Sequence, residues 1–474
     1  MSPENSTRKS EQIDGAIALA NRVSSCRTVG FTAADRIDPF WDGLWEQGSS
    51  ASWLGRDLAT RMERSGRGRI PGHLSIPSAS LGDSLRSAAR SQPRLNAMSV
   101  IDSWRTVTGE QLAAITGDTA SAGARSRTMS ELFAAGVADQ GTLLASGMSS
   151  TGKDRRTLLH RPSRTQSFDT DVAPRLTYPE WVSVTAGHPW ASGGQYDRHN
   201  ILAVELALRV AEYCEVGAVV GEKLSTWDML AYTGAGQAAP PAGMQRAADA
   251  TLIRTDGARL AVEITASMTG ALQKKIRAWA ELLNKTRTDA TALAAVVFVV
   301  ATPPGKRVNR GEALSRVRTI VQNAARDFSG IAGDRTQSRM YVVSWDEWFP
   351  AARHASPSFF SLDAWRPSGN PSVNLWEKAA LLDIFDTPFE PQYPEDALAV
   401  LDNLTGVRSV PGWLRTGTAP ELWPDAIKAL GFTGIPVLAS EEEERERAVL
   451  GAARGAAADV LVPKRLRFGG PSDL

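Results

Sequence analysis

Cysteine is scarce in this 474-residue chain, which contains only Cys26 and Cys214. Two cysteines so far apart exclude a disulfide framework and a cysteine-rich zinc site. The five histidines include no pair with zinc-ligand spacing on one helix. A long apolar run is also missing, because the longest, at 293–301, is too short to span a bilayer and predicts a buried strand. The polar N-terminus has no apolar signal core, so we expect a soluble, cytoplasmic protein without a membrane partner.

Net charge is nearly absent as well, since 53 Lys and Arg stand against 52 Asp and Glu. The neutral total conceals two regions of opposite sign. Residues 60–164 hold 15 Lys and Arg against 8 Asp and Glu, a net charge of +7, whereas residues 376–474 hold 10 against 16, a net charge of −6. A basic region is typical of nucleic-acid binding, although an uneven surface charge is the alternative interpretation.

What is present is an ordinary globular composition, 42% hydrophobic and 22% charged. The length suggests about three domains. The pattern along the chain predicts a mixed α/β fold. We expect four regions: a helical and loop N-terminal region (1–93), a winged helix-turn-helix domain (94–160), a central α/β domain (177–350) and an acidic, Trp-rich, mainly helical region (360–474).

The winged-helix prediction comes from the order of elements after residue 94. A helix with apolar residues at helical spacing is followed by a short helix, in which Thr108 and Gln111 form a capping-box pattern and Gly117 is the stop signal. A third helix starts near Arg127, and two short strands are expected around Gln140-Gly141. In this motif the third helix enters the DNA major groove. Winged helices also serve as protein docking modules, and that alternative stays open.

The predicted DNA contacts are arginines, because guanidinium groups bind phosphates and base edges. Arg125 and Arg127 stand at the exposed start of the third helix. The other candidates are Arg105, Arg155 and Arg156.

The central region alternates buried strands with helices, which predicts a mixed sheet covered on both faces. Two strands, at 247–254 and 259–267, are joined by a Thr-Asp-Gly turn at 255–257. A helix follows, then the buried strand at 293–301. A further helix and strand complete the region near Trp345.

The sharpest chemical feature is a pair of carboxylates, Asp249 on one strand of this hairpin and Glu263 on the other. An acidic residue in an apolar strand is costly to bury unless it is paired or binds a cation. Two carboxylates on neighbouring strands are typical ligands of Mg²⁺ or Mn²⁺, which activates water and stabilises charge on a phosphate. Glu205 is a candidate third carboxylate. Lys274 and Lys275, on the next helix, are candidates to neutralise the phosphate.

This arrangement resembles the PD-(D/E)xK nuclease-like fold. More narrowly, residues 94–300 resemble the replication-relaxation family, in which a winged helix precedes a nuclease-like domain. The family pattern of His, Asp, Glu and Lys matches His199, Asp249, Glu263 and Lys275. The resemblance implies a DNA-binding protein of plasmid replication or mobilisation type, with a metal-dependent nuclease-like site. Two positions depart from the pattern: Ala248 replaces proline, and Thr265 replaces lysine.

Other interpretations remain at this point. In the first alternative both carboxylates are structural: Asp249 caps a turn, and Glu263 pairs with Arg259 or a lysine. The chain is then a catalytically inactive DNA-binding adaptor that recruits protein partners through its C-terminal region. A defence-system effector nuclease would share the site. None of the six tyrosines lies in a recognisable nucleophile motif, which favours hydrolysis over transesterification. The sequence does not determine the oligomeric state.

Overall fold

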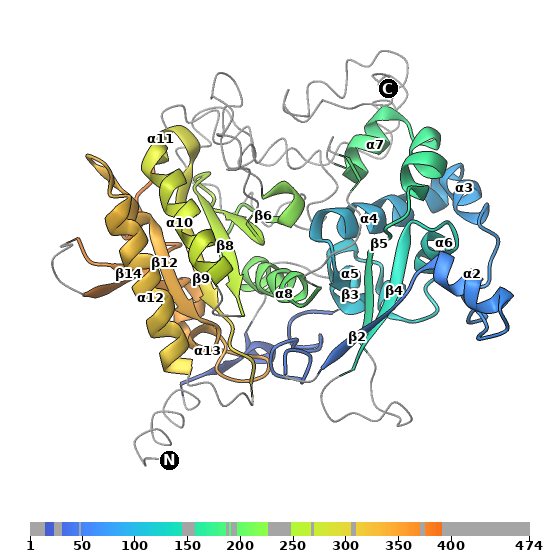
Figure 1. Ribbon diagram of the computed structural model, residues 1–474, viewed down its shortest axis with the longest axis horizontal. Helices are drawn as coiled ribbons and strands as arrows, with labels where there is room; N and C mark the ends of the chain where they lie inside the picture. The colour runs from blue at the N-terminus through green and yellow to red at the C-terminus, as the bar shows by residue number, and fades with distance from the viewer. Residues whose placement is uncertain are drawn as a thin grey trace.

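The fold has two halves, each built on its own β-sheet, with helix α8 (Asp197–Tyr213) between them (Figure 1). The computed structural model describes residues 15–22, 31–46, 49–144, 157–185, 189–190, 197–225, 248–266, 270–304, 310–369 and 375–390. Helices and strands are mixed in both halves, which confirms the predicted α/β class. The predicted C-terminal region beyond residue 390 lies outside the described residues. Within the described ranges, no helix combines the length and the apolar character needed to cross a membrane.

The first half contains a four-stranded antiparallel sheet of order β2-β4-β5-β3. Helix α4 lies at the centre of the first half and contacts α3, α5, α6 and α7. The elements are β2 (Ser50–Leu54), α2 (Arg56–Arg64), α3 (Ser80–Leu85), α4 (Ala88–Trp104), β3 (Val107–Thr108), α5 (Gly109–Thr116), α6 (Arg127–Ala134), β4 (Ala138–Leu144), β5 (Thr157–Pro162) and α7 (Tyr178–Thr185).

Helix α5 begins and ends at the residues that the sequence indicated. The Thr108 hydroxyl accepts a hydrogen bond from the Gln111 amide at 3.0 Å, and the Gln111 side chain accepts one from the Thr108 amide at 3.1 Å. This is the predicted capping box. Gly117 follows the helix with φ of +74°, a left-handed conformation that glycine adopts without strain.

The prediction of two short strands around Gln140-Gly141 is wrong. Both residues lie inside the single strand β4, which pairs with β5 from Ala138↔Pro162 to Leu143↔Thr157. Gly141 is required for packing instead of for a turn, because a Cβ there would lie 2.7 Å from the Trp53 ring of β2.

The second half contains a seven-stranded sheet of order β15-β14-β12-β9-β8-β7-β6. Strands β8, β9 and β12 are parallel, and the other pairs are antiparallel. The elements after α8 are β6 (Ala218–Gly221), β7 (Ala250–Ile253), β8 (Arg259–Thr265), α10 (Gly270–Lys285), α11 (Thr288–Thr291), β9 (Leu293–Val300), α12 (Arg310–Asp327), β10 (Gly330–Ile331), β11 (Asp334–Arg335), β12 (Met340–Ser344), α13 (Trp345–Trp348), β13 (His354–Ala355), α14 (Pro357–Phe360), β14 (Asp363–Pro367) and β15 (Trp376–Ala380).

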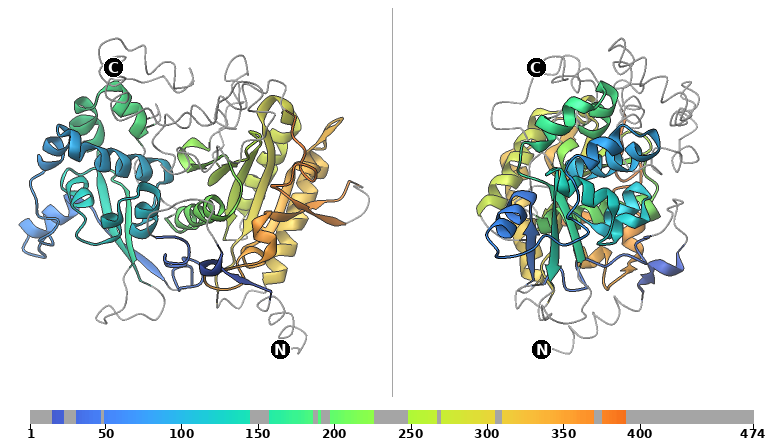
Figure 2. Two further views of the ribbon diagram at one scale, coloured as in Figure 1. Left: turned by 180° about the vertical axis from the view of Figure 1, so that it is seen from behind. Right: turned by 90° about the vertical axis from the view of Figure 1, so that its right-hand side faces the viewer.

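Both faces of the central strands are covered, which explains why they are apolar throughout. Helices α10 and α12 share an apolar cluster with Phe298 of β9, whereas α8 shares the other cluster with Val297. Successive strand residues point to opposite faces, so the two clusters lie on opposite sides of the sheet. Figure 2 shows the two yellow helices together on one side of the strands.

Strand pairings cross two of the predicted domain boundaries. The sheet of the second half does not end near residue 350, because β14 pairs with β12 and β15 pairs with β14. The region expected to be mainly helical therefore begins with two strands. The N-terminal region also reaches the second half, where β1 (Ile17–Ala18) pairs with β13. These pairings connect segments that are distant in the chain, so no local pattern indicates them.

The buried His160 of β5 is expected to lower the free energy of unfolding in acid. It is 1% exposed, neither ring nitrogen has a hydrogen-bond partner among the described residues, and burial lowers its pKa to about 4. The unfolded chain therefore binds a proton between about pH 6.5 and 4 that the folded chain excludes, and stability falls as pH falls through this window. We expect this residue alone to subtract about 2 kcal/mol from the free energy of unfolding between pH 7 and pH 5.

Urea unfolding of wild type, His160→Phe and the control His73→Gln at both pH values checks this expectation. The His160→Phe variant should lose about 2 kcal/mol less than wild type, since phenylalanine does not titrate. An equal loss in wild type and His160→Phe would contradict it.

Candidate functional site

The structure brings together the predicted carboxylates, Asp249 and Glu263. Strands β7 and β8 pair with Ala250 opposite Val262, so Asp249, directly before β7, lies opposite Glu263. The Asp249 amide donates to the Val262 carbonyl at 2.9 Å, and its carboxylate accepts from the Ile264 amide at 2.6 Å. These bonds fix the Asp249 side chain beside the C-terminal end of β8.

Helix α10 supplies the cation of the site. Lys275 forms an ion pair with Glu263, and its Nζ lies 3.6 Å from Oδ1 of Asp249. Trp279, one helical turn further, donates from Nε1 to Oε1 of Glu263. Residues four apart share one helix face, and the buried Leu272, Ile276 and Leu283 hold that face against the sheet.

The site opens to solvent on one side only. The Glu263 side chain is 1% exposed, whereas those of Asp249 and Lys275 are 16% and 31% exposed. A ligand therefore reaches Asp249 and Lys275 first. Lys274, the neighbouring candidate, is exposed, so Lys275 is the lysine that contacts the carboxylates.

Burial raises the pKa of Glu263 to about 7. The positive charge of Lys275 opposes this rise, and the negative charge of Asp249 adds to it. A carboxyl group poised near neutral pH is common at functional sites, and a cation that binds both carboxylates would favour its ionised form.

His199 lies at the edge of the same group, in the first turn of α8. Its Nδ1 is 3.1 Å from the Ile264 carbonyl, and its ring meets that of Trp45 edge-on at 5.8 Å. Burial lowers the pKa of His199, and Lys275 lowers it further, against the opposing charge of Asp249. The imidazole is therefore held in its neutral form near pH 7, with electrostatic contact to both Asp249 and Lys275.

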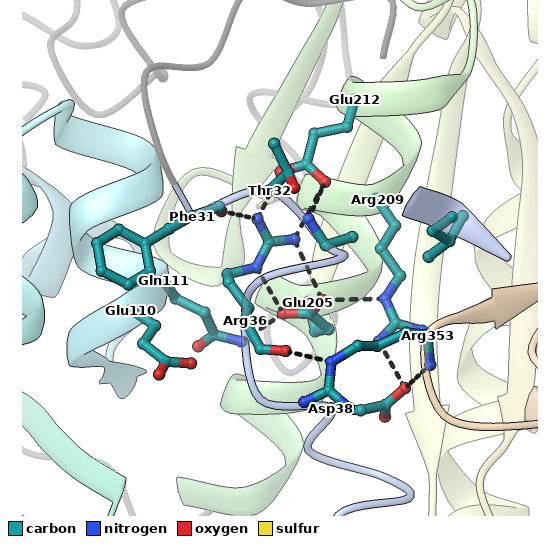
Figure 3. A network of polar contacts seen from close by, with 12 residues as sticks. Phe31, Thr32, Arg36, Asp38, Glu110, Gln111, Glu205, Arg209, Glu212 and Arg353 are labelled. Carbon is teal, nitrogen blue, oxygen red and sulfur yellow. Dashed lines mark hydrogen bonds and ion pairs between the residues drawn. The ribbon is translucent and has the colours of Figure 1, made fainter. Parts of the chain in front are cut away.

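The prediction that Glu205 supplies a third carboxylate is wrong. Glu205 follows His199 by six residues on α8, a rise of about 9 Å along the helix. Its oxygens accept from Arg36, Arg209 and Gln111, at 2.9–3.2 Å. This residue is part of a buried network that fastens the segment 31–46 to α8 (Figure 3).

Arg36 is the centre of that network and binds both Glu205 and Glu212 (Figure 3). All three side chains have no exposed surface or almost none. Burial raises the pKa of Glu205, but Arg36 and Arg209 more than offset this and lower it to about 2. Arg209 also bonds Asp38, so each arginine of the network contacts two carboxylates.

The predicted DNA-contacting arginines have mixed surroundings. Arg125 and Arg127 are exposed, and Arg127 pairs with Glu131 at 2.7 Å. Arg105 is half-buried at the end of α4, with a positive φ of 66°. Arg155 and Arg156 lie outside the described residues. The expected recognition helix α6 is buried from Thr128 to Ala134, so it does not present a free face for a DNA groove.

The donor set fits a hard divalent cation only with added water. Within the described ranges, no group of three or more His, Cys, Asp and Glu side chains is arranged to hold a metal ion. Asp249 and Glu263 both approach one amine, Lys275 Nζ, so a single positive charge lies within reach of both. Mg²⁺ commonly takes one or two protein carboxylates and keeps several waters, and these two residues are compatible with that mode.

Sequence reasoning missed Trp279 and Trp45 as neighbours of the site. The spacing of Trp279, four residues after Lys275, is a signal that could have placed it beside Glu263. Trp45 has no such signal, since it is far from His199 in the chain. No family model matches this chain, and no curated protein or solved structure matches it either.

Proposed function

We propose that this chain is a DNA-binding protein with a metal-dependent phosphodiesterase site of the PD-(D/E)xK nuclease-like type. The observation that carries the proposal is the convergence of Asp249, Glu263 and Lys275 from three separate elements. His199 beside them corresponds to the histidine that begins the replication-relaxation pattern. The proposed setting is plasmid replication or mobilisation, and a defence-system nuclease would use the same site.

Each residue has a chemical role in this proposal. Asp249 and Glu263 would hold Mg²⁺ or Mn²⁺, and the bound ion would supply an activated water and neutralise charge on the phosphate. Lys275 stabilises the negative charge that develops on the phosphate oxygens. Trp279 keeps the Glu263 carboxylate oriented through its indole hydrogen bond. His199 is neutral and lies next to Asp249, where it exchanges a proton with water or substrate.

DNA binding is proposed for the first half of the chain. The order α4, β3, α5, α6, β4 and β5 supports a winged helix-turn-helix. Arg125 and Arg127, exposed at the start of α6, contact phosphates in this proposal, as do Arg105, Arg155 and Arg156.

A second candidate is the inactive adaptor, and one observation favours it. Lys275 already forms ion pairs with both carboxylates, so the site contains a cation without a metal. In that case the nuclease-like domain is a scaffold that positions DNA or a partner protein.

A cleavage assay tests the proposed function. Full-length wild type, Glu263→Gln and the control Glu281→Gln are incubated with plasmid and single-stranded DNA in Mg²⁺ or Mn²⁺. Glu281 is on the same helix as Lys275, but it is part-exposed and pairs with Lys285. We expect cleavage by wild type and the control, and a loss of about 100-fold or more in Glu263→Gln.

Two results would contradict catalysis. Equal cleavage by Glu263→Gln would identify another site or a contaminant as the source. Absence of cleavage by wild type with either metal would leave the adaptor as the function of the domain.

A further inference from the structure

The segment that covers one side of the expected recognition helix is itself basic. Phe133 of α6 is fully buried in a cluster with Ala59 of α2 and with Ile70 and Leu74 of the following segment. Residues 56–74 therefore cover the Phe133 side of α6, whereas Met129 and Leu132 of α6 pack into the main core. Any contact with a nucleic acid on this side is made first by the covering segment.

Four arginines of that segment are exposed, and we name them the α2 ridge: Arg61, Arg64, Arg67 and Arg69. None of the four pairs with a carboxylate among the described residues, in contrast to Arg127, which pairs with Glu131. Unpaired arginines at close spacing create a positive potential that is available to an external anion.

The ridge has a defined shape and is not a loose tail. Arg61 and Arg64 are three residues apart on α2 and share one side of it. The chain then turns back, with the Arg67 amide donating to the Met62 carbonyl at 2.9 Å. Gly66 has φ of +67°, and Gly68 packs against Met62, where a Cβ would lie 3.3 Å away. The turn therefore holds Arg67 and Arg69 against the end of the helix.

We propose that the α2 ridge binds the phosphate backbone of duplex DNA, independently of sequence. The inference rests on the proposed DNA-binding function and assigns the main contact to a surface other than α6. Guanidinium groups neutralise phosphates in a row, and no base-reading face is present on this segment. An anionic membrane is a weaker fit, because the exposed apolar residues of α2 are only Leu58 and Met62, and Asp57 and Glu63 lie among the arginines.

Fluorescence anisotropy with the full-length chain tests the proposal. Two labelled duplexes of unrelated sequence are titrated between 50 and 200 mM salt without divalent metal, so that no cleavage occurs. The ridge variant carries Arg61→Gln, Arg64→Gln, Arg67→Gln and Arg69→Gln. The matched control carries Arg277→Gln, Arg316→Gln, Arg326→Gln and Arg335→Gln, four exposed arginines of the second half. Circular dichroism melts confirm that both variants are folded.

We expect wild type and the control to bind both duplexes alike, with affinity that falls steeply as salt rises. In the ridge variant the steepness of log affinity against log salt should decrease by roughly 0.9 for each phosphate that is no longer neutralised, about 3 to 4 in total.

An unchanged slope in the ridge variant, together with weakened binding in Arg125→Ala/Arg127→Ala, would contradict the role of the α2 ridge and leave DNA binding in place. Absence of duplex binding by wild type at 50 mM salt would overturn DNA binding itself. Binding of wild type to phosphatidylserine vesicles but not to duplex would assign the ridge to a membrane instead.

Discussion

Arg36→Met is expected to lower the free energy of unfolding by about 3–5 kcal/mol. Arg36 is fully buried and bonds both Glu205 and Glu212. Without it, Glu212 loses the guanidinium group that donates to both of its carboxylate oxygens, and the Ala33 amide still donates to Oε2 at 3.0 Å. An uncompensated buried charge costs far more than the ion pair contributes, which explains the size of the effect.

Urea unfolding at pH 7 measures this effect, and two variants control it. Arg86→Met removes an exposed ion pair with Asp83, whose side chains are 67% and 59% exposed, and should cost less than about 1 kcal/mol. Arg36→Met/Glu212→Leu removes both charges and should be less destabilised than Arg36→Met alone, because the orphaned carboxylate is gone. If Arg36→Met and Arg86→Met lose similar amounts of unfolding free energy, the network does not stabilise the packing of segment 31–46 on α8.

Lys275→Ala is expected to destabilise the metal-free protein by about 3 kcal/mol at pH 8. The lysine is the cation between Asp249 and Glu263, so its removal leaves two carboxylates facing each other. The loss should be smaller at pH 5. Burial raises the pKa of Glu263 to about 7, so the folded state retains a proton that the unfolded state releases above about pH 4.5. The stabilising effect of this proton is complete below pH 4.5 and disappears as pH rises through 7. Loss of the positive charge of Lys275 raises the pKa of Glu263 further, so the stabilising effect then extends to higher pH.

Thermal unfolding of Lys275→Ala and of its exposed neighbour variant Lys274→Ala checks this prediction, with and without Mn²⁺. Lys274→Ala should stay within about 0.5 kcal/mol of wild type. Mn²⁺ should restore stability to Lys275→Ala by mass action, since it binds the folded carboxylate pair. A Lys275→Ala variant as stable as wild type at pH 8, with no response to Mn²⁺, would show that the carboxylates do not form a coupled pair.

Local sequence patterns predicted those parts of the fold in which the interacting residues are close in the chain. The capping box of Thr108 and Gln111 involves residues three apart, and the sequence alone located it. The turn at 255–257 likewise defines the hairpin of β7 and β8, so the pairing of Asp249 with Glu263 follows from a short stretch of sequence. Lys275 required one further step, because α10 must pack on the sheet, but the periodic apolar face of that helix indicated the side that it buries.

Only the tertiary structure decided the roles of Glu205, Gly141 and α6. Glu205 is bonded to Arg36, 169 residues earlier, and Gly141 is covered by Trp53 from a strand that the sequence did not indicate. Helix α6 is buried against α3, α4 and β4, and its Phe133 also packs on residues 56–74, whose composition is that of a solvated linker. Hydrophobic periodicity and caps report the preference of a segment for a helix or strand. They carry no information about which distant segment covers it, because that choice depends on the free energy of packing the whole chain. The sequence by itself therefore indicated the carboxylate pair and a lysine at 274 or 275. The packing of distant segments decided which of these charged residues meet and which are buried in other contacts.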